Sequence, residues 1–569
     1  MKISRRISLD RFAVALLLST VAVAGCKPTA EPNPAPLPAP VTDDSPRHFT
    51  AADISPQLPY DVDVARVRRL DDAGKIETAQ REFDILSWQA FLALNWPASA
   101  SGEPQGSVPT TVPETLRVWS FYRPSSTIFL PNGAAPEPTW DKPGTRAFDV
   151  VLTKTKAAWR QHATVADQNF EAFSGPLVDQ NGKWARYQAL VNHEEFDYLV
   201  SNKLYSLEGQ VEFSQKHEGN EVSMPINDGV NKHGAIEIKL AWKELGPNDD
   251  KSRFLTQQVK VKVSEASGQI PRTITAGLVG MHIIMRTVSS PEWIWATFEQ
   301  IDNVRQNPKG DGTMSHANFY NPATPSAKTN VLAPMNAVRD PSTKQFTTWY
   351  ESLTRTPVQV QRVEVPTQPN LNDLDATLAN DAKQLNGEVQ ALLRGLDKNN
   401  ALQYYELIDT QWPVHPNAPA FPGGDASAPG SIAHKTPGDM LPVFLVNTTM
   451  ETYFQKGTQP AGALEQDDRL PADSLAKGKS IDNTVVTGTE SCVGCHYSAG
   501  IAVGFKKDAQ GNFQIVDGHK VPIYGENGHF GKTGNGNFSW MLQIEASSVS
   551  EPNQSPLKTK SGVQPNAQP

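Results

Sequence analysis

One apolar run in the middle of the chain constrains the fold more than any other feature. It spans Ile274–Val288 (ITAGLVGMHIIMRTV) and has only three polar breaks, which predicts a strand buried at the centre of a sheet. Segments 236–242 and 259–263 alternate apolar with polar or small residues, and segment 291–298 (PEWIWATF) predicts a further strand. The middle of the chain is therefore expected to form an antiparallel sheet.

Two helices are expected beside this sheet. Segment 82–96 (EFDILSWQAFLALNW) places apolar residues at helical spacing and stops at Pro97, and segment 371–396 repeats leucine at the same spacing. We therefore predict a large α+β domain over residues 48–412, with an antiparallel sheet and flanking helices.

Composition narrows the class of protein. The chain has 569 residues, which is room for two to four domains, and a mean hydropathy of −0.43, which argues against a polytopic membrane protein. The net charge is −9, and without the first 25 residues it is −12. Because an acidic surface repels phosphate backbones, we expect no nucleic-acid partner. Three cysteines are too few for a disulfide framework.

The first cysteine follows an export signal. A basic start precedes an apolar stretch of twelve residues at 12–23, too short to span a bilayer comfortably, and the stretch ends in Val-Ala-Gly-Cys26. Residues 1–25 resemble a bacterial lipoprotein signal peptide, which implies acylation of Cys26, with palmitate among the acyl chains, and anchoring in the membrane. An ordinary secretory signal and a twin-arginine signal, suggested by Arg5-Arg6, are the alternatives.

A proline-rich stretch follows the lipidation site. Residues 26–47 are expected to be an extended tether that holds the body away from the membrane. In Gram-negative lipoproteins an aspartate after the lipidated cysteine favours the inner membrane. This chain has Lys27 there, so the resemblance implies the outer membrane, with the body facing the periplasm.

The other two cysteines form the motif Cys492-Val-Gly-Cys495-His496, the Cys-x-x-Cys-His pattern of c-type haem attachment. Two thiols one helical turn apart reach the two vinyl groups of one porphyrin, and the adjacent histidine then lies under the iron. This predicts one covalent haem c per chain. A disulfide between the two cysteines, or a zinc site completed by His519 and His529, is the alternative.

The segment around this motif resembles bacterial c-type cytochromes. Together with GLVGMHIIMRT and EWIWATFEQIDN, the motif also resembles a family of large bacterial exported proteins with one C-terminal haem module. The resemblance implies a small all-α module over residues 438–547. A helix over 441–456 would precede the motif, and a short helix containing Met541 would end the module. Residues 413–437 are expected to be a linker or loop, and residues 548–569 a disordered tail.

The resemblance implies His496 as the proximal iron ligand and a downstream methionine as the distal one. Met541 is the only downstream methionine, although it falls in the expected terminal helix, whereas those cytochromes place the ligand in a loop before that helix. An open sixth position remains an alternative, as do these other side chains: His519, His529, Met281, His282, Met285, Met440 and Met450.

The large domain shows no second catalytic motif. His193-Glu194-Glu195 lacks the second histidine of a zinc-protease helix, and no nucleophile elbow or phosphate-binding glycine loop occurs. His282, Trp293 and Trp295 are expected in the core.

Three functions are compatible with these features. The first is electron transfer through the haem to a redox partner protein or a small-molecule donor or acceptor. The second is a haem oxidoreductase of peroxidase or oxygenase type, with an open coordination site. The third is an envelope protein in which the haem is structural or senses a gas.

Overall fold

The computed structural model describes residues 43–113, 115–141, 176–216, 222–228, 232–265, 268–324, 329–331, 351–352, 355–362, 373–414, 440–442, 444–452, 492–496, 499–516, 518–525 and 536–549. Described residues from Ser45 onward belong to one compact unit. The signal peptide, most of the tether, the expected linker and most of the expected tail lie outside the described residues.

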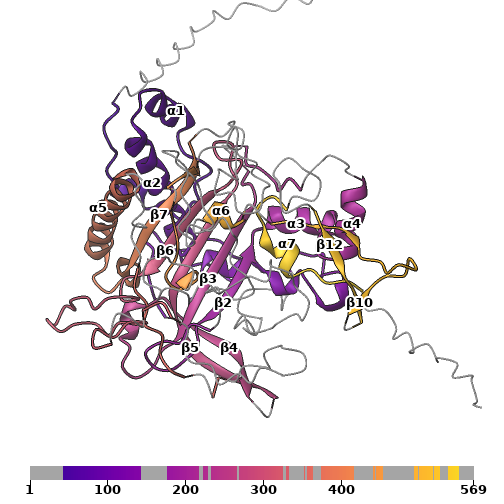
Figure 1. Cartoon of the computed structure of the whole chain (residues 1–569). Helices are drawn as coiled ribbons and strands as arrows, with labels where there is room; N and C mark the ends of the chain where they lie inside the picture. Colours follow the sequence, from indigo (N-terminus) through magenta and orange to yellow (C-terminus); the bar gives the residue numbers. More distant parts are fainter. Residues whose placement is uncertain are drawn as a thin grey trace, which may run out of the picture. The chain divides into compact units, whose positions relative to one another are not determined.

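An antiparallel sheet of eight strands organises this unit (Figure 1). The strand order is β1-β2-β3-β5-β6-β7-β8, and β4 pairs with the first half of the long strand β5. The strands are β1 Arg123–Pro124, β2 Arg186–Val191, β3 Ile236–Glu244, β4 Thr256–Glu265, β5 Gly268–Met285, β6 Ile294–Gln300, β7 Tyr405–Pro413 and β8 Met440–Leu441. The apolar run of the sequence therefore lies in the middle of the sheet, paired on both sides.

Helices and short strands complete the unit. The helices are α1 Val64–Asp72, α2 Ile76–Leu94, α3 His193–Ser201, α4 Leu207–Lys216, α5 Asp373–Leu396, α6 Cys492–His496 and α7 Trp540–Ile544. Two further pairs of short strands lie between α6 and α7: β9 Ala502–Phe505 pairs with β12 Pro522–Tyr524, and β10 Ile515–Val516 pairs with β11 His519–Lys520.

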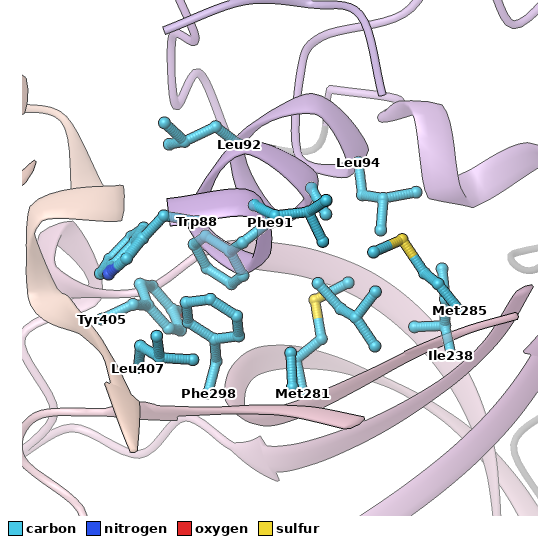
Figure 2. Packing of buried hydrophobic residues seen from close by; sticks show 14 of the residues in the cluster. Trp88, Phe91, Leu92, Leu94, Ile238, Met281, Met285, Phe298, Tyr405 and Leu407 are labelled. Atoms are coloured by element: carbon cyan, nitrogen blue, oxygen red, sulfur yellow. The ribbon is translucent and has the colours of Figure 1, made fainter. Parts of the chain in front are cut away.

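The first face of the sheet packs against α2 and α5. Alternate residues of β3, β5 and β6 share one apolar core with the buried face of α2. Figure 2 shows Met281 and Met285 of β5 in this core, together with Phe91 and Leu94 of α2. Phe91 stacks on Phe298 with ring centroids 4.3 Å apart. The first face is therefore closed by apolar packing.

The second face carries the C-terminal segment. Ile284 and Trp295 project from this face into an apolar cluster with residues of α3, α6 and α7. Gln210 of α4 ties the same segment down, because its amide donates to the carbonyl of Leu542 at 2.7 Å and accepts from the backbone N–H of Ala502 at 2.9 Å. Residues of the C-terminal segment thus pack onto strands that lie some 250 residues earlier in the sequence.

Most of the predicted elements are confirmed. The expected antiparallel sheet with flanking helices is present, with β3, β4, β5 and β6 over the predicted strands and α2 and α5 over the predicted helices. The short helices at the Cys-x-x-Cys-His motif and around Met541 are present as α6 and α7.

Two expectations about the C-terminal segment are wrong for the described residues. Within the predicted helix 441–456, the described residues 441–442 and 444–451 form no helix: Leu441 ends β8, and the turn that follows binds β6 instead, with the Thr448 backbone N–H donating to Glu299 at 2.6 Å. Asn447 also makes a local bond of the kind that competes with a helix, because its side-chain oxygen accepts the Thr449 backbone N–H at 2.9 Å. The segment is also not all-α, because residues 502–524 form the short strands β9–β12, whose turns contain Gly511 and Gly518 at positive φ.

Candidate haem-attachment site

The sheet fixes the start of α6. Gln411 of β7 accepts the Val493 backbone N–H at 2.9 Å, and its amide group donates to the carbonyl of Pro442 at 2.6 Å. Val493 is fully buried, and the half-buried thiol of Cys492 lies 3.7 Å from the carbonyl of Leu445. The side chain of Cys495 lies outside the described residues.

His496 has a defined tautomer. Its Nδ1 lies 2.7 Å from the backbone carbonyl oxygen of Phe538, which can only accept a hydrogen bond, so Nδ1 carries the proton. Burial lowers the pKa of His496 to about 3, against a smaller opposing effect of the Phe538 carbonyl. The imidazole is therefore neutral, and its Nε2 presents an unprotonated lone pair.

An unusual backbone segment holds the Phe538 carbonyl in place. Asn537 and Phe538 are buried and both adopt the left-handed region, with φ of 51° and 68°. A bulky residue in that region stores strain, which the surroundings must hold. The indole N–H of Trp293 donates to the Asn537 carbonyl at 3.2 Å, and the Asn537 side chain accepts the Met224 backbone N–H at 3.0 Å. This segment was not predicted from the sequence.

Trp295 places the imidazole over the sheet. Its ring lies 4.8 Å from the His496 ring, and it is directly opposite Ile284 of β5 and Gln411 of β7. The expectation that Trp293 and Trp295 lie in the core is confirmed, since both are at most 3% exposed. Both also contact the segment that carries His496 or its partner, so they are structural parts of the site.

A group of polar and charged side chains lies next to Trp295 on the second face of the sheet. His282 is opposite Lys239 of β3 and Thr297 of β6. Its two ring nitrogens contact the Thr297 hydroxyl at 2.9 Å and a Glu451 carboxylate oxygen at 3.2 Å. His282 and Lys239 both contribute to lowering the pKa of His496, so their charges act on this site. His282 is buried, as expected, and its ring nitrogens are hydrogen-bonded to Thr297 and Glu451.

The structure separates the candidates for the distal ligand. Met281 and Met285 lie on the opposite face, against α2, and do not belong to the His496 side. Met541 is 7% exposed and packs in the cluster with Val493 and Leu542. That Met541 is the distal iron ligand remains a prediction. Met440 shares that cluster, and Met450 belongs to a third one.

The histidines downstream of the motif differ in what the structure describes. Nδ1 of His519, in β11, lies 3.0 Å from the carbonyl of Ser548, while His529 lies outside the described residues. Cys26 and the signal peptide also lie outside them. Within the described ranges, no three His, Cys, Asp or Glu side chains form a group able to hold a metal ion.

The described residues around His496 fit a c-type haem. Histidines that bind metals characteristically donate the second ring N–H to a carbonyl, which orients the ring and raises the basicity of the ligating nitrogen. His496 meets this requirement through Phe538. The part of the haem site that this fit concerns is one axial ligand, His496, next to the cysteines of the attachment motif.

Comparison of the chain with protein-family models, with curated protein sequences and with solved structures returns no match. Among the helices that the structure describes, none is long and apolar enough to cross a membrane.

Proposed function

We propose that this protein is an exported c-type cytochrome that transfers electrons through one haem bound covalently to Cys492 and Cys495, with His496 as proximal ligand. The observation that carries the proposal is the hydrogen bond from Nδ1 of His496 to the Phe538 carbonyl, which leaves Nε2 free to bind iron. The bound haem supplies one-electron redox chemistry.

The protein's own residues position this group and hold its surroundings constant. Gln411 fixes the start of α6, Phe538 fixes the imidazole, and Trp295 packs against the imidazole ring. A site that rests on a central sheet reorganises little when its charge changes, which favours rapid electron transfer to a redox partner protein or a small molecule.

The polar group around His282 favours a second candidate function, a haem oxidoreductase with an open coordination site. His282 is hydrogen-bonded to Glu451 and lies on the same sheet face as Trp295. A histidine held by a carboxylate is a suitable general acid–base group beside bound peroxide or oxygen. The two functions differ in whether a protein side chain fills the sixth position.

The iron spectrum separates them. We expect the untreated reduced protein not to bind carbon monoxide, because a protein ligand fills the sixth position. With Met541 as that ligand, the ferric protein should show the methionine–iron charge-transfer band, and Met541→Ala should abolish it. Met440→Ala is the matched control, since Met440 shares the same apolar cluster. Carbon monoxide binding by the untreated protein would favour the oxidoreductase.

We also propose that the chain is a lipoprotein of the cell envelope, anchored through Cys26 to the outer membrane with its body in the periplasm. Cys26→Ser is expected to move the protein from the membrane fraction to the soluble fraction, because it removes the acyl chains. The measurement is fractionation of cells that express each form. An unchanged distribution between the fractions would contradict lipidation.

A further inference from the structure

Two buried glutamates lie beside the segment that holds His496. Glu195 of α3 is fully buried and Glu237 of β3 is 9% exposed. Among the described residues, no N–H or hydroxyl group donates to either oxygen of Glu195 or to Oε1 of Glu237. Buried carboxylates are normally paired with cations or hydrogen-bond donors. This pair is therefore a feature that folding alone does not explain.

The two carboxyl groups influence each other's pKa. Burial, and then the neighbouring Glu237, raise the pKa of Glu195 well above its usual range. Burial raises the pKa of Glu237 to about 7, against lowering contributions from Ser539 and Glu195. Glu195 therefore stays protonated, and Glu237 gains or loses a proton near neutral pH.

The pair is connected to His496 along two routes. Ser539, whose proximity lowers the pKa of Glu237, directly follows the Phe538 whose carbonyl binds His496. Across the sheet, Glu237 is opposite Ile284, which is in turn opposite Trp295, whose ring packs at a tilt of 58° against the His496 ring. Glu237 therefore lies on the same sheet face as Trp295, two strands away from it, and within the protein interior, where charges are poorly screened.

The charged groups around the pair are few. Glu545 of α7 raises the pKa of Glu237, and its carboxylate accepts a hydrogen bond from Ser125. Lys239, two residues along β3, lies 4.0 Å from Glu451. On α3, Glu194 accepts a hydrogen bond from Asn192. Among the described residues, no cation forms an ion pair with either oxygen of Glu195 or with Oε1 of Glu237.

We propose that Glu195 and Glu237 form a proton-binding site that couples proton uptake to electron uptake. The Glu237 carboxylate binds one proton from water when an electron arrives from the donor, and releases it when the electron passes to the acceptor. Charge is thereby conserved within the buried site. This inference rests on the proposed function.

The test is the pH dependence of the reduction potential of the holoprotein. For the wild type, the equilibrium constant for reduction should fall by up to tenfold per pH unit near pH 7, which is about 59 mV for one electron. In Glu237→Gln this slope should flatten. The potentials of the two proteins should coincide at low pH and diverge above pH 7, where only the wild type carries the negative charge.

Asp84→Asn is the matched control. Asp84 is also buried, with its pKa raised to about 7 by burial, but it lies on α2 behind the opposite face of the sheet. The Asp84→Asn variant should show the same pH dependence of the reduction potential as the wild type. Any part of that dependence that comes from the carboxylates of the porphyrin should be equal in all of these proteins. Equal slopes in wild type and Glu237→Gln would overturn the proposal.

Unfolding experiments separate the possible failures. Because the folded-state pKa of Glu237 is raised, the stability it contributes is present below its unfolded pKa and lost as the pH rises through about 7. Glu237→Gln should remove this loss from the denaturation curves of the protein. If the wild type carries no haem, the proposed function fails. If the wild type carries haem and Glu237 titrates without changing the potential, only the coupling fails.

Discussion

Replacing both Cys492 and Cys495 by alanine is expected to lower covalently bound haem from about one per chain to background, because no thiol remains to form a thioether. The effect should be close to complete, whereas either single variant should retain part of the haem through one thioether. The measurement is haem-specific staining after denaturing electrophoresis, with the haemochrome spectrum of the purified protein.

Cys26→Ser is the matched cysteine control. It removes the third thiol of the chain and should leave the haem content unchanged. Far-ultraviolet circular dichroism of the double variant checks that the sheet still forms, since the eight strands do not depend on α6 for their pairing. Full haem content in the double variant would contradict covalent attachment at this motif.

The second large effect is expected in the core between α2 and the sheet. Phe91→Ala should lower the free energy of unfolding by about 3–5 kcal/mol, because it removes a fully buried ring and leaves a cavity. Phe91 stacks on Phe298 and meets Trp88 edge-on at 5.5 Å, so the substitution also removes two aromatic contacts. Urea denaturation followed by tryptophan fluorescence measures the change.

Phe513→Ala provides the comparison. Phe513 lies near the short strands of the C-terminal segment and is 44% exposed, so its loss should cost less than about 1 kcal/mol. If Phe91→Ala were as mild as Phe513→Ala, α2 would not form the main core with the sheet, and the packing in Figure 2 would be wrong.

The sequence predicted those helices and strands whose apolar pattern follows directly from which of their faces is buried. Segment 274–288 is apolar on both faces because β5 is covered on both, and 236–242 alternates because Glu237 and Lys239 of β3 lie on the second face, next to Ile284 and His282 of β5. The haem motif was equally visible, since its spacing follows from the chemistry of attachment and not from the fold.

The remaining parts depend on contacts between distant segments. Phe538 holds His496 because of two left-handed residues, and only the Gly-Asn-Gly-Asn stretch before it indicated such a turn. Glu195 and Glu237 are 42 residues apart in sequence and come near each other because Asn192, which precedes α3, is hydrogen-bonded to Ile236 at the start of β3. The expectation of a helix over 441–456 failed because Thr448 binds Glu299 of β6, a tertiary contact that local propensity does not contain.

The mass and colour of the purified wild-type protein test the central claim most directly. Expressed in a host that matures c-type cytochromes, the chain should gain the mass of one haem, about 616 Da, and should be red with the haemochrome spectrum of a haem held by two thioethers. Colourless protein without the added mass would contradict covalent haem at Cys492 and Cys495.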